Sequence, residues 1–362
     1  MKKRRASKKL PPQMTVLLLV LCLLAVFVGR YLESRAAPVS APAEASADET
    51  FEVRFLDIGQ GDSALVRCGA KTLLIDGGKV KNNQKLVARL KELNIDHLDA
   101  VICSHPDEDH CGGLAAVLAA TKTDSFYCSV DSWHTKVFSD VVKYVEQQGI
   151  SVTVPSAGDT FALADASVEF LGPVEDYGDD PNEGSLVARV RYGQTSFLFT
   201  GDMGFEAEDD MLAANVDVSA TVLKVAHHGS AGSSSTEFLE AVNPEYAVIS
   251  VGADNDYGHP TQAALDRLAR CGIPVYRTDL LGEIVAVSDG TTVTLTAEEK
   301  TAVRDVPSLT TDTYAYVANA SSKVVHAATC GKLPGENNRV YFETLDDALS
   351  AGYRKHASCL GN

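Results

Sequence analysis

The feature that most constrains this chain is a run of acidic and imidazole side chains between an apolar segment and a helical one. Residues 104–113 read Ser-His-Pro-Asp-Glu-Asp-His-Cys-Gly-Gly, after the apolar stretch 98–103 and before the helical pattern 114–120. A loop at the carboxyl end of a buried strand is where α/β proteins place their chemistry. A solvated acidic turn is the simpler interpretation, but so many potential ligands in one loop favour a metal site.

The spacing within the run predicts two neighbouring metal ions. If the loop is extended, His105, Asp107 and Asp109 face one way and His110 the other, because side chains alternate along an extended chain. Each ion could then receive an imidazole and a carboxylate. We therefore predict that His105, Asp107, Asp109 and His110 bind metal, and that Asp109 is also catalytic.

This run resembles the metal-binding signature of the metallo-β-lactamase superfamily, and Asp107, where many members carry His, resembles the ComEC family of DNA-uptake proteins. Five more segments match in order: 55–63, 74–78, 199–202, 223–230 and 255–260. The resemblance implies an αββα four-layer sandwich of two mixed sheets with the site at one edge. We expect the hydrolase domain to stand alone, without the polytopic channel of full-length ComEC proteins.

The later motifs each follow a strand-like segment. Asp202 could bridge two ions with one carboxylate and is expected to be catalytic, although a plain β-turn Asp is the alternative. Adjacent His227 and His228 would point oppositely on an extended segment, so we assign metal to His227 and a substrate contact to His228. His259, in a Gly-His-Pro turn, is expected to contact a substrate phosphate or to act as a general acid, unless it only caps a helix.

The chain departs from lactam-hydrolysing members at residues 179–185. These residues offer no imidazole where such members place a third His on the first metal. We expect Asn182 and Ser185 to contact the substrate, with Asn182 alternatively a weak ligand. Oxygen-rich coordination favours Mn²⁺ or a mixed site over a pair of Zn²⁺ ions. Asp57 and Asp76 are expected to support the site rather than to bind metal.

The amino-terminal segment has a different character. Six Lys and Arg residues between positions 2 and 9 precede an uncharged run at 16–28. That run is short for a membrane span, so residues 1–30 are expected to be either a cleaved signal peptide or an uncleaved anchor. Either would place the rest at the outer face of the cell membrane or outside the cell. Residues 31–50, rich in Ala, Pro, Ser and Glu, are typical of a flexible tether.

The hydrolase domain is expected over residues 51–298, where strand-like and helical patterns alternate. Predicted strands lie at 51–56, 63–66, 71–75, 100–103, 168–171, 186–192, 195–200, 220–225, 247–251 and 275–278. Predicted helices lie at 83–93, 139–148, 236–241 and 261–271, and a final hairpin covers 282–295.

A second module is expected at 313–362, after a linker at 299–312. It resembles the small zinc-binding module at the start of Ada-type DNA repair proteins. His-x₃-Cys and His-x₂-Cys spacings would give a closed tetrahedral zinc site from His326, Cys330, His356 and Cys359, with His356 where that family usually has Cys. A Cys330–Cys359 disulfide is the alternative, and a segment this short needs one of the two.

The charge limits the partners. The formal net charge of −17 repels nucleic acid at long range, which argues against tight sequence-specific DNA binding but does not exclude a nuclease whose cations sit at the scissile phosphate. In the second module, Arg339, Arg354 and Lys355 offer local positive charge near Tyr341 and Tyr353, a combination suited to backbone contact and base stacking, so we expect the module to hold DNA.

The leading hypothesis is an exported, two-metal phosphodiesterase acting on DNA, with DNA, the membrane and DNA-uptake machinery as expected partners. Its metals would be two Mn²⁺ or Zn²⁺ ions, plus one structural zinc in the second module. The alternatives are an exported acyl or lactam hydrolase of the same fold, or a non-catalytic DNA-capturing component of an uptake machine.

Overall fold

The computed structural model describes residues 51–253 and 255–297, then 316–319, 322–330, 332–334, 339–342, 344–350 and 352–361. The predicted signal or anchor, the tether and the linker lie outside these residues. Within them, no helix combines the length and the apolar character needed to span a membrane.

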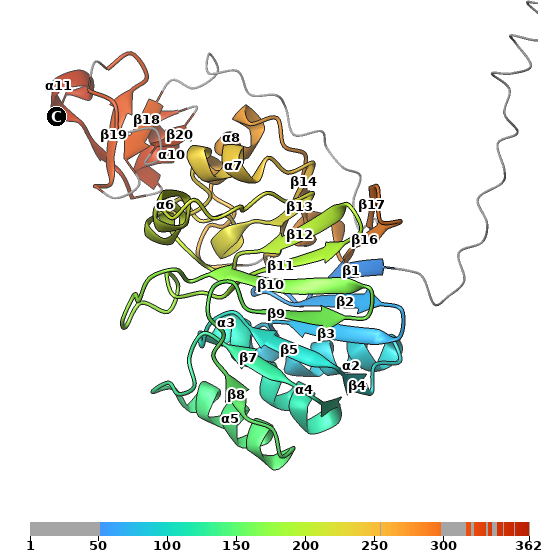
Figure 1. Ribbon diagram of the computed structural model, residues 1–362. Helices are drawn as coiled ribbons and strands as arrows, with labels where there is room; N and C mark the ends of the chain where they lie inside the picture. Colours follow the sequence, from blue (N-terminus) through green and yellow to red (C-terminus); the bar gives the residue numbers. More distant parts are fainter. Residues whose placement is uncertain are drawn as a thin grey trace, which may run out of the picture. The chain divides into compact units, whose positions relative to one another are not determined.

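Two mixed sheets form the centre of the body, residues 51–297 (Figure 1). The first has the order β17-β16-β1-β2-β3-β5-β7-β8 and the second β15-β14-β13-β12-β11-β10-β9, while β4 and β6 form a separate short pair. The strands are β1 (Phe51–Phe55), β2 (Ala64–Cys68), β3 (Lys71–Ile75), β4 (His97–Leu98), β5 (Ala100–Cys103), β6 (Lys122–Thr123), β7 (Phe126–Cys128), β8 (Val152–Thr153), β9 (Thr160–Leu163), β10 (Ala166–Gly172), β11 (Val187–Tyr192), β12 (Thr195–Phe199), β13 (Val222–Lys224), β14 (Tyr246–Ile249), β15 (Val275–Arg277), β16 (Ile284–Ser288) and β17 (Val293–Ala297).

Apolar side chains fill three layers around these sheets. Between the sheets, Phe51 stacks on Tyr192 with ring centroids 5.0 Å apart, because alternate residues of β1 face inward. α2, α4 and α5 pack on the outer face of the first sheet, and α6, α7 and α8 on that of the second. The predicted αββα sandwich is therefore confirmed.

The helices lie close to the predicted ranges. Thr135 starts α5 earlier than predicted, because its hydroxyl accepts a hydrogen bond from the Phe138 amide and caps the helix. The helical elements of the body are η1 (Val80–Asn82), α2 (Asn83–Glu92), α3 (Glu108–Cys111), α4 (Leu114–Ala120), α5 (Lys136–Gln147), α6 (Phe205–Ala213), η2 (Ala226–Gly229), α7 (Thr236–Val242), α8 (Gln262–Arg270) and α9 (Thr278–Leu281). The acid-rich α6 was not predicted.

Parallel strands bring the functional loops to one edge. β3, β5 and β7 are parallel in the first sheet, and β12, β13 and β14 in the second. The residues that directly follow β3, β5, β12, β13 and β14 are Asp76, Ser104, Thr200, Val225 and Ser250. Loops that are distant in sequence therefore start at the same edge of each sheet.

The carboxyl-terminal module is a sheet of order β20-β18-β19-β21 with two short helices. Its elements are β18 (Tyr316–Asn319), β19 (Val324–Ala327), β20 (Arg339–Phe342), α10 (Leu345–Ser350), β21 (Arg354–Lys355) and α11 (Ala357–Leu360). Tyr353 is only 8% exposed and packs edge-on against Phe342, so the expectation that it offers a stacking surface to DNA is wrong. Arg354 and Lys355 are exposed.

Candidate metal centre

The loop after β5 is wound rather than extended. Asp107 precedes the single helical turn α3, where its carbonyl accepts hydrogen bonds from the amides of His110 and Cys111. Simple alternation of side chains therefore does not apply beyond Asp107. Glycine at the end of the run lets this turn pack closely, since a Cβ on Gly113 would lie 2.2 Å from the Gly77 carbonyl oxygen.

Four buried side chains gather at the centre of this edge. One ligand atom each from Asp62, His110, Asp202 and His228 lies within 4.8 Å of the others. Asp202 is central: Oδ1 lies 3.0 Å from His110 Nε2, and Oδ2 lies 3.6 Å from His228 Nε2. Asp202, which follows β12, therefore lies beside His110 of the run 104–113.

The remaining predicted ligands flank this centre. His105 lies next to His110, with ring centroids 4.1 Å apart, and its Nε2 is 4.0 Å from Asp107 Oδ2. On the other side, Asp109 Oδ2 is 3.7 Å from His228 Nε2. The ligand atoms therefore extend to either side of Asp202, as two neighbouring ions would require.

Several buried atoms of the centre lack a well-directed hydrogen-bond partner in the described parts of the chain. They are Nε2 of His105, His110 and His228, and Oδ1 of Asp62 and Asp202. Each such atom costs about 1–3 kcal/mol when it is left unsatisfied. A mixed set of nitrogen and oxygen donors fits divalent metal ions, so the residues present fit the ions that the fold implies.

Hydrogen bonds behind the imidazoles orient them. His110 Nδ1 donates to Asp76 Oδ2 at 2.9 Å, and Asp76 Oδ1 accepts from the Ser104 amide at 2.7 Å. His228 Nδ1 donates to the Ser250 carbonyl at 2.9 Å. Because these partners hold a proton at Nδ1 in both rings, Nε2 is the atom that faces the centre and would bind an ion after losing its own proton. Asp76 thus occupies the supporting position predicted for it.

Charges at the centre are strongly coupled. Burial lowers the pKa of His105 well below its usual value, and the neighbouring His110 lowers it further, so the ring is neutral. Burial acts in the same direction on His110, but the carboxylates of Asp202 and Asp76 outweigh it and raise the pKa of His110. Asp202 keeps its charge at neutral pH because His110 and His228 outweigh burial and hold its pKa well below the ordinary value.

The adjacent histidines after β13 do not lie on an extended segment. His227 and His228 both have left-handed backbone angles, with φ of 51° and 53°. Both rings therefore turn toward Asp202, with His227 Nε2 3.7 Å from Oδ2. The geometry favours the buried His228 as a metal ligand, while His227, with 31% of its side chain exposed, lines the pocket. The alternation on which the assignment of His227 was based therefore does not hold for this segment.

Asp62 is a member of the centre that the sequence interpretation missed. Its Oδ2 lies 2.6 Å from the Nζ of buried Lys224, which outweighs burial and keeps the pKa of Asp62 below its usual value. The sequence signal for this contact was the preceding glycine, Gly61. A Cβ there would lie 2.3 Å from the Asp109 carbonyl oxygen, so only glycine lets the segment that carries Asp62 approach the loop after β5.

A pocket of about 190 Å³ opens over the centre. Its lining residues are Gln60, Asp107, Asp109, Asn182, Asp202, His227, His228, Tyr257 and His259. Asn182 and His259 therefore stand where a substrate contact was predicted. Ser185 does not: it is fully buried, and its Oγ accepts from the Asp202 amide, so it supports the site from behind.

The charge of His259 bears on the choice between a phosphate contact and a general acid. Burial and the neighbouring His227 and His228 lower its pKa to about 4. At neutral pH the ring is uncharged, so it can give a hydrogen bond to a phosphate oxygen but has no extra proton to donate as a general acid.

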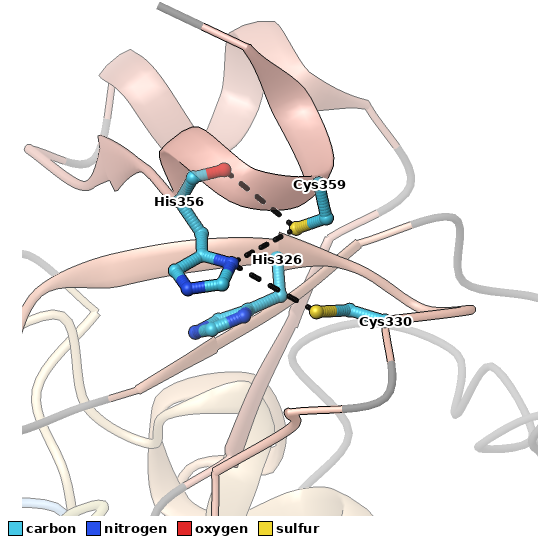
Figure 2. A group of neighbouring side chains, drawn as sticks. All are labelled: His326, Cys330, His356 and Cys359. Carbon is cyan, nitrogen blue, oxygen red and sulfur yellow. Dashed lines mark hydrogen bonds between the residues drawn. The ribbon is translucent and has the colours of Figure 1, made fainter.

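The carboxyl-terminal module has its own ligand cluster (Figure 2). His326, Cys330, His356 and Cys359 each place one ligand atom within 4.8 Å of the others, and His356 Nδ1 lies 3.2 Å from Cys359 Sγ and 3.8 Å from Cys330 Sγ. Tetrahedral zinc sets nitrogen and sulfur about 3.5 Å apart. Both cysteines are free thiols here.

Several known proteins are similar to this chain. A family model described as the metallo-beta-lactamase superfamily matches residues 56–253. ComE operon protein 3 of Bacillus subtilis is 31% identical over 251 residues, covering 64% of this chain and 32% of its own length. Competence protein ComA of Neisseria gonorrhoeae is 34% identical over 248 residues, covering 68% of this chain and 33% of its own length.

Recombination protein 2 of Haemophilus influenzae is 30% identical over 241 residues, covering 65% of this chain and 28% of its own length. The chain therefore spans about a third of the length of the curated relatives it matches. Among solved structures, the metallo-beta-lactamase fold protein YhfI from Bacillus subtilis is 13% identical with a TM-score of 0.46, covering 66% of this chain and 100% of that one.

Proposed function

The chain belongs to the metallo-beta-lactamase superfamily, a superfamily of metal-dependent hydrolases, and from that premise we propose that it is a phosphodiesterase that cleaves DNA. The observation that supports this proposal best is the carboxylate-rich pocket. Asp107, Asp109 and Asp202 line it together with imidazoles. Such mixed oxygen and nitrogen ligands suit divalent ions that bind phosphate oxygens.

Two divalent ions, when bound, supply a water nucleophile at neutral pH and neutralise charge on the phosphoryl oxygens. His105 and Asp107 would hold one ion, and Asp109, His110 and His228 the other, with Asp202 reaching both. In the protein itself, Asp76 and Ser250 hold the imidazole protons at Nδ1.

The substrate would be oriented by the pocket wall. Asn182 and His259 both line the pocket and carry donor groups. As His259 is neutral at pH 7, it would give a hydrogen bond to a phosphate oxygen rather than transfer a proton. Departure of the leaving oxygen would then depend on a proton from solvent.

The relatives support DNA as the substrate. One of the relatives matched is named a competence protein and another a recombination protein. A lactam or acyl hydrolase is disfavoured, because the segment 179–185 brings Ser185 rather than an imidazole to His105. The third possibility, a non-catalytic component that captures DNA for uptake machinery, predicts binding without cleavage.

The test incubates the purified protein, with Mn²⁺ or Zn²⁺, with single-stranded DNA, a cyclic dinucleotide and a chromogenic lactam. We expect cleavage of DNA that is lost in Asp109→Asn and retained in Asp140→Asn, a surface control on α5. Cleavage of the lactam alone would overturn the proposal. Binding of DNA without cleavage under every metal condition would favour the capture role.

We further propose that the carboxyl-terminal cluster holds a structural zinc ion, and that residues 1–30 direct export. The basic residues before an uncharged run support export to the outer face of the membrane. Protease digestion of intact cells would degrade an exported catalytic domain. A domain that is digested only after lysis would contradict export.

A further inference from the structure

Tyr257 is the exposed aromatic side chain of the metal pocket. It is 56% exposed, although large apolar side chains are usually covered, and it lines the same pocket as Asp202. Its ring lies nearly parallel to that of His259, with centroids 5.8 Å apart and 7° between the planes. The two rings are therefore stacked at the pocket wall.

The loop that carries Tyr257 is held by one side chain. Asn255 Nδ2 donates to the carbonyls of Gly252 at 2.9 Å and His259 at 2.7 Å. Its Oδ1 accepts from the amides of Tyr257 at 3.2 Å and His259 at 2.9 Å. The exposed ring is thus presented by an ordered loop, so a ligand that covers it would lose little entropy in ordering it.

Lys79 reaches Tyr257 from the opposite sheet. It follows β3, and its Nζ donates to the Tyr257 hydroxyl at 3.0 Å and lies 3.9 Å from Asp109 Oδ2. Only 17% of its side chain is exposed. A positive charge is therefore held at the mouth of a pocket whose charged lining residues include three carboxylates.

We infer that Lys79 and Tyr257 form a nucleotide clamp beside the metal centre, in which Tyr257 stacks on a base and Lys79 contacts the adjacent phosphate. This inference rests on the proposed phosphodiesterase function and adds a substrate class to it. A base can lie on Tyr257 only when it has left its own stack. The clamp therefore selects single-stranded nucleic acid over duplex, and it does so without reading sequence, because every base has a flat face.

The test compares oligothymidylate with an abasic phosphodiester polymer of equal length, which has the charges but not the bases. Binding is measured by fluorescence anisotropy in the Asp202→Asn background, where hydrolysis does not interfere. Base stacking contributes about 5- to 100-fold in affinity. We expect Tyr257→Ala to weaken oligothymidylate binding by about that factor and abasic binding less than twofold, while Tyr257→Phe stays within about threefold of the parent.

Lys79→Gln should weaken binding of both polymers by about 3- to 10-fold. The slope of the logarithm of the binding constant against the logarithm of salt concentration should also fall by the contribution of about one phosphate contact. The matched control is Lys136→Gln, a surface lysine with 80% of its side chain exposed on α5. Equal effects of Tyr257→Ala on the two polymers, or no effect on either, would overturn the clamp.

The closing measurement separates the clamp from the proposed function. If wild-type protein cleaves oligothymidylate but Tyr257→Ala keeps the same KM, the clamp is wrong and the phosphodiesterase stands. If Tyr257→Ala shows the base-dependent loss of binding but the wild-type protein cleaves no phosphodiester, the clamp stands and the proposed activity is wrong.

Discussion

The two ligand clusters of this protein differ in what surrounds them. In the body, Asp62, His110, Asp202 and His228 are all buried beside a sandwich with three apolar clusters. In the carboxyl-terminal module, only His326 of the four ligands is buried, and the apolar cluster among the described residues is small, built on Ala318, Val325, Ala348 and Tyr353. The body can fold on its own core, whereas the small module needs a staple.

The ligand chemistry differs in the same way. The body cluster offers oxygen and nitrogen atoms held by Asp76 and Ser250, which suits ions that exchange substrate and water. The module offers two thiols and two imidazoles, a closed set typical of structural zinc. In the body the metal would serve chemistry, and in the module it would serve folding.

The largest expected effect tests the module. Structural zinc contributes roughly 10 kcal/mol or more to the folding of small domains. Removing metal with a strong chelator should unfold residues 316–361 and leave the body folded. Limited proteolysis with mass spectrometry would show early cleavage within the module alone.

Cys330→Ser should reproduce that effect without chelator, and zinc analysis should show one equivalent lost. If a reducing agent alone releases the module while zinc content is unchanged, a Cys330–Cys359 disulfide stabilises it instead. If both clusters unfold together on chelation, the contrast between the two regions is wrong.

The second effect tests the body. Asp202→Ala removes the carboxylate that approaches His110 and His228, so hydrolysis should fall at least about 1,000-fold and bound metal by more than one equivalent. Metal content, rates and circular dichroism should be measured together. Full activity in a folded variant would contradict the two-metal site, and loss of the module's zinc would contradict the independence of the two regions.

Asp76→Asn tests orientation rather than ligation. The variant loses charge at the Asp76 oxygen that accepts from His110 Nδ1, so we expect metal affinity in the body to fall by about 10- to 100-fold. Titration with Mn²⁺ measures this shift. Zinc in the module should be unaffected. A complete loss of binding would mean that Asp76 is itself a ligand.

The smallest effect concerns pH and does not involve metal. Burial would raise the pKa of Glu283, but hydrogen bonds from Arg89 and Arg54 outweigh it and lower the pKa below the usual 4.5. The folded protein therefore keeps Glu283 ionised where the unfolded chain takes up a proton. Its stabilisation is complete above about pH 4.5 and is lost as the pH falls through the lowered value.

Glu283→Gln should accordingly reduce the free energy of unfolding of the body by about 2 kcal/mol at pH 7 and by less at pH 3. Urea titrations at both pH values measure the difference. Asp140→Asn, which breaks an exposed pair with Lys136, should cost less than about 0.5 kcal/mol at either pH. Equal losses from Glu283→Gln at pH 3 and pH 7 would exclude a role for the charge.

Local patterns determined much of this molecule. Apolar alternation located β1 and the helical period located α2, because each pattern reflects burial within one element. The crowded run 104–113 and the spacing of His326, Cys330, His356 and Cys359 indicated two ligand clusters. The ligand types of the run 104–113 are adjacent in sequence, and those of the module come as two short pairs, so the chain itself displays them.

The tertiary structure decided which atoms face the centre. Left-handed angles at His227 and His228 turn both rings toward Asp202, against the alternation expected of an extended segment, and Ser185 lies behind Asp202. Asp62 joined the cluster through Lys224, 162 positions along the chain. The Lys79–Tyr257 contact likewise joins loops from opposite sheets. Such pairings depend on how two sheets bring their strand ends together, and no local sequence period encodes that distance.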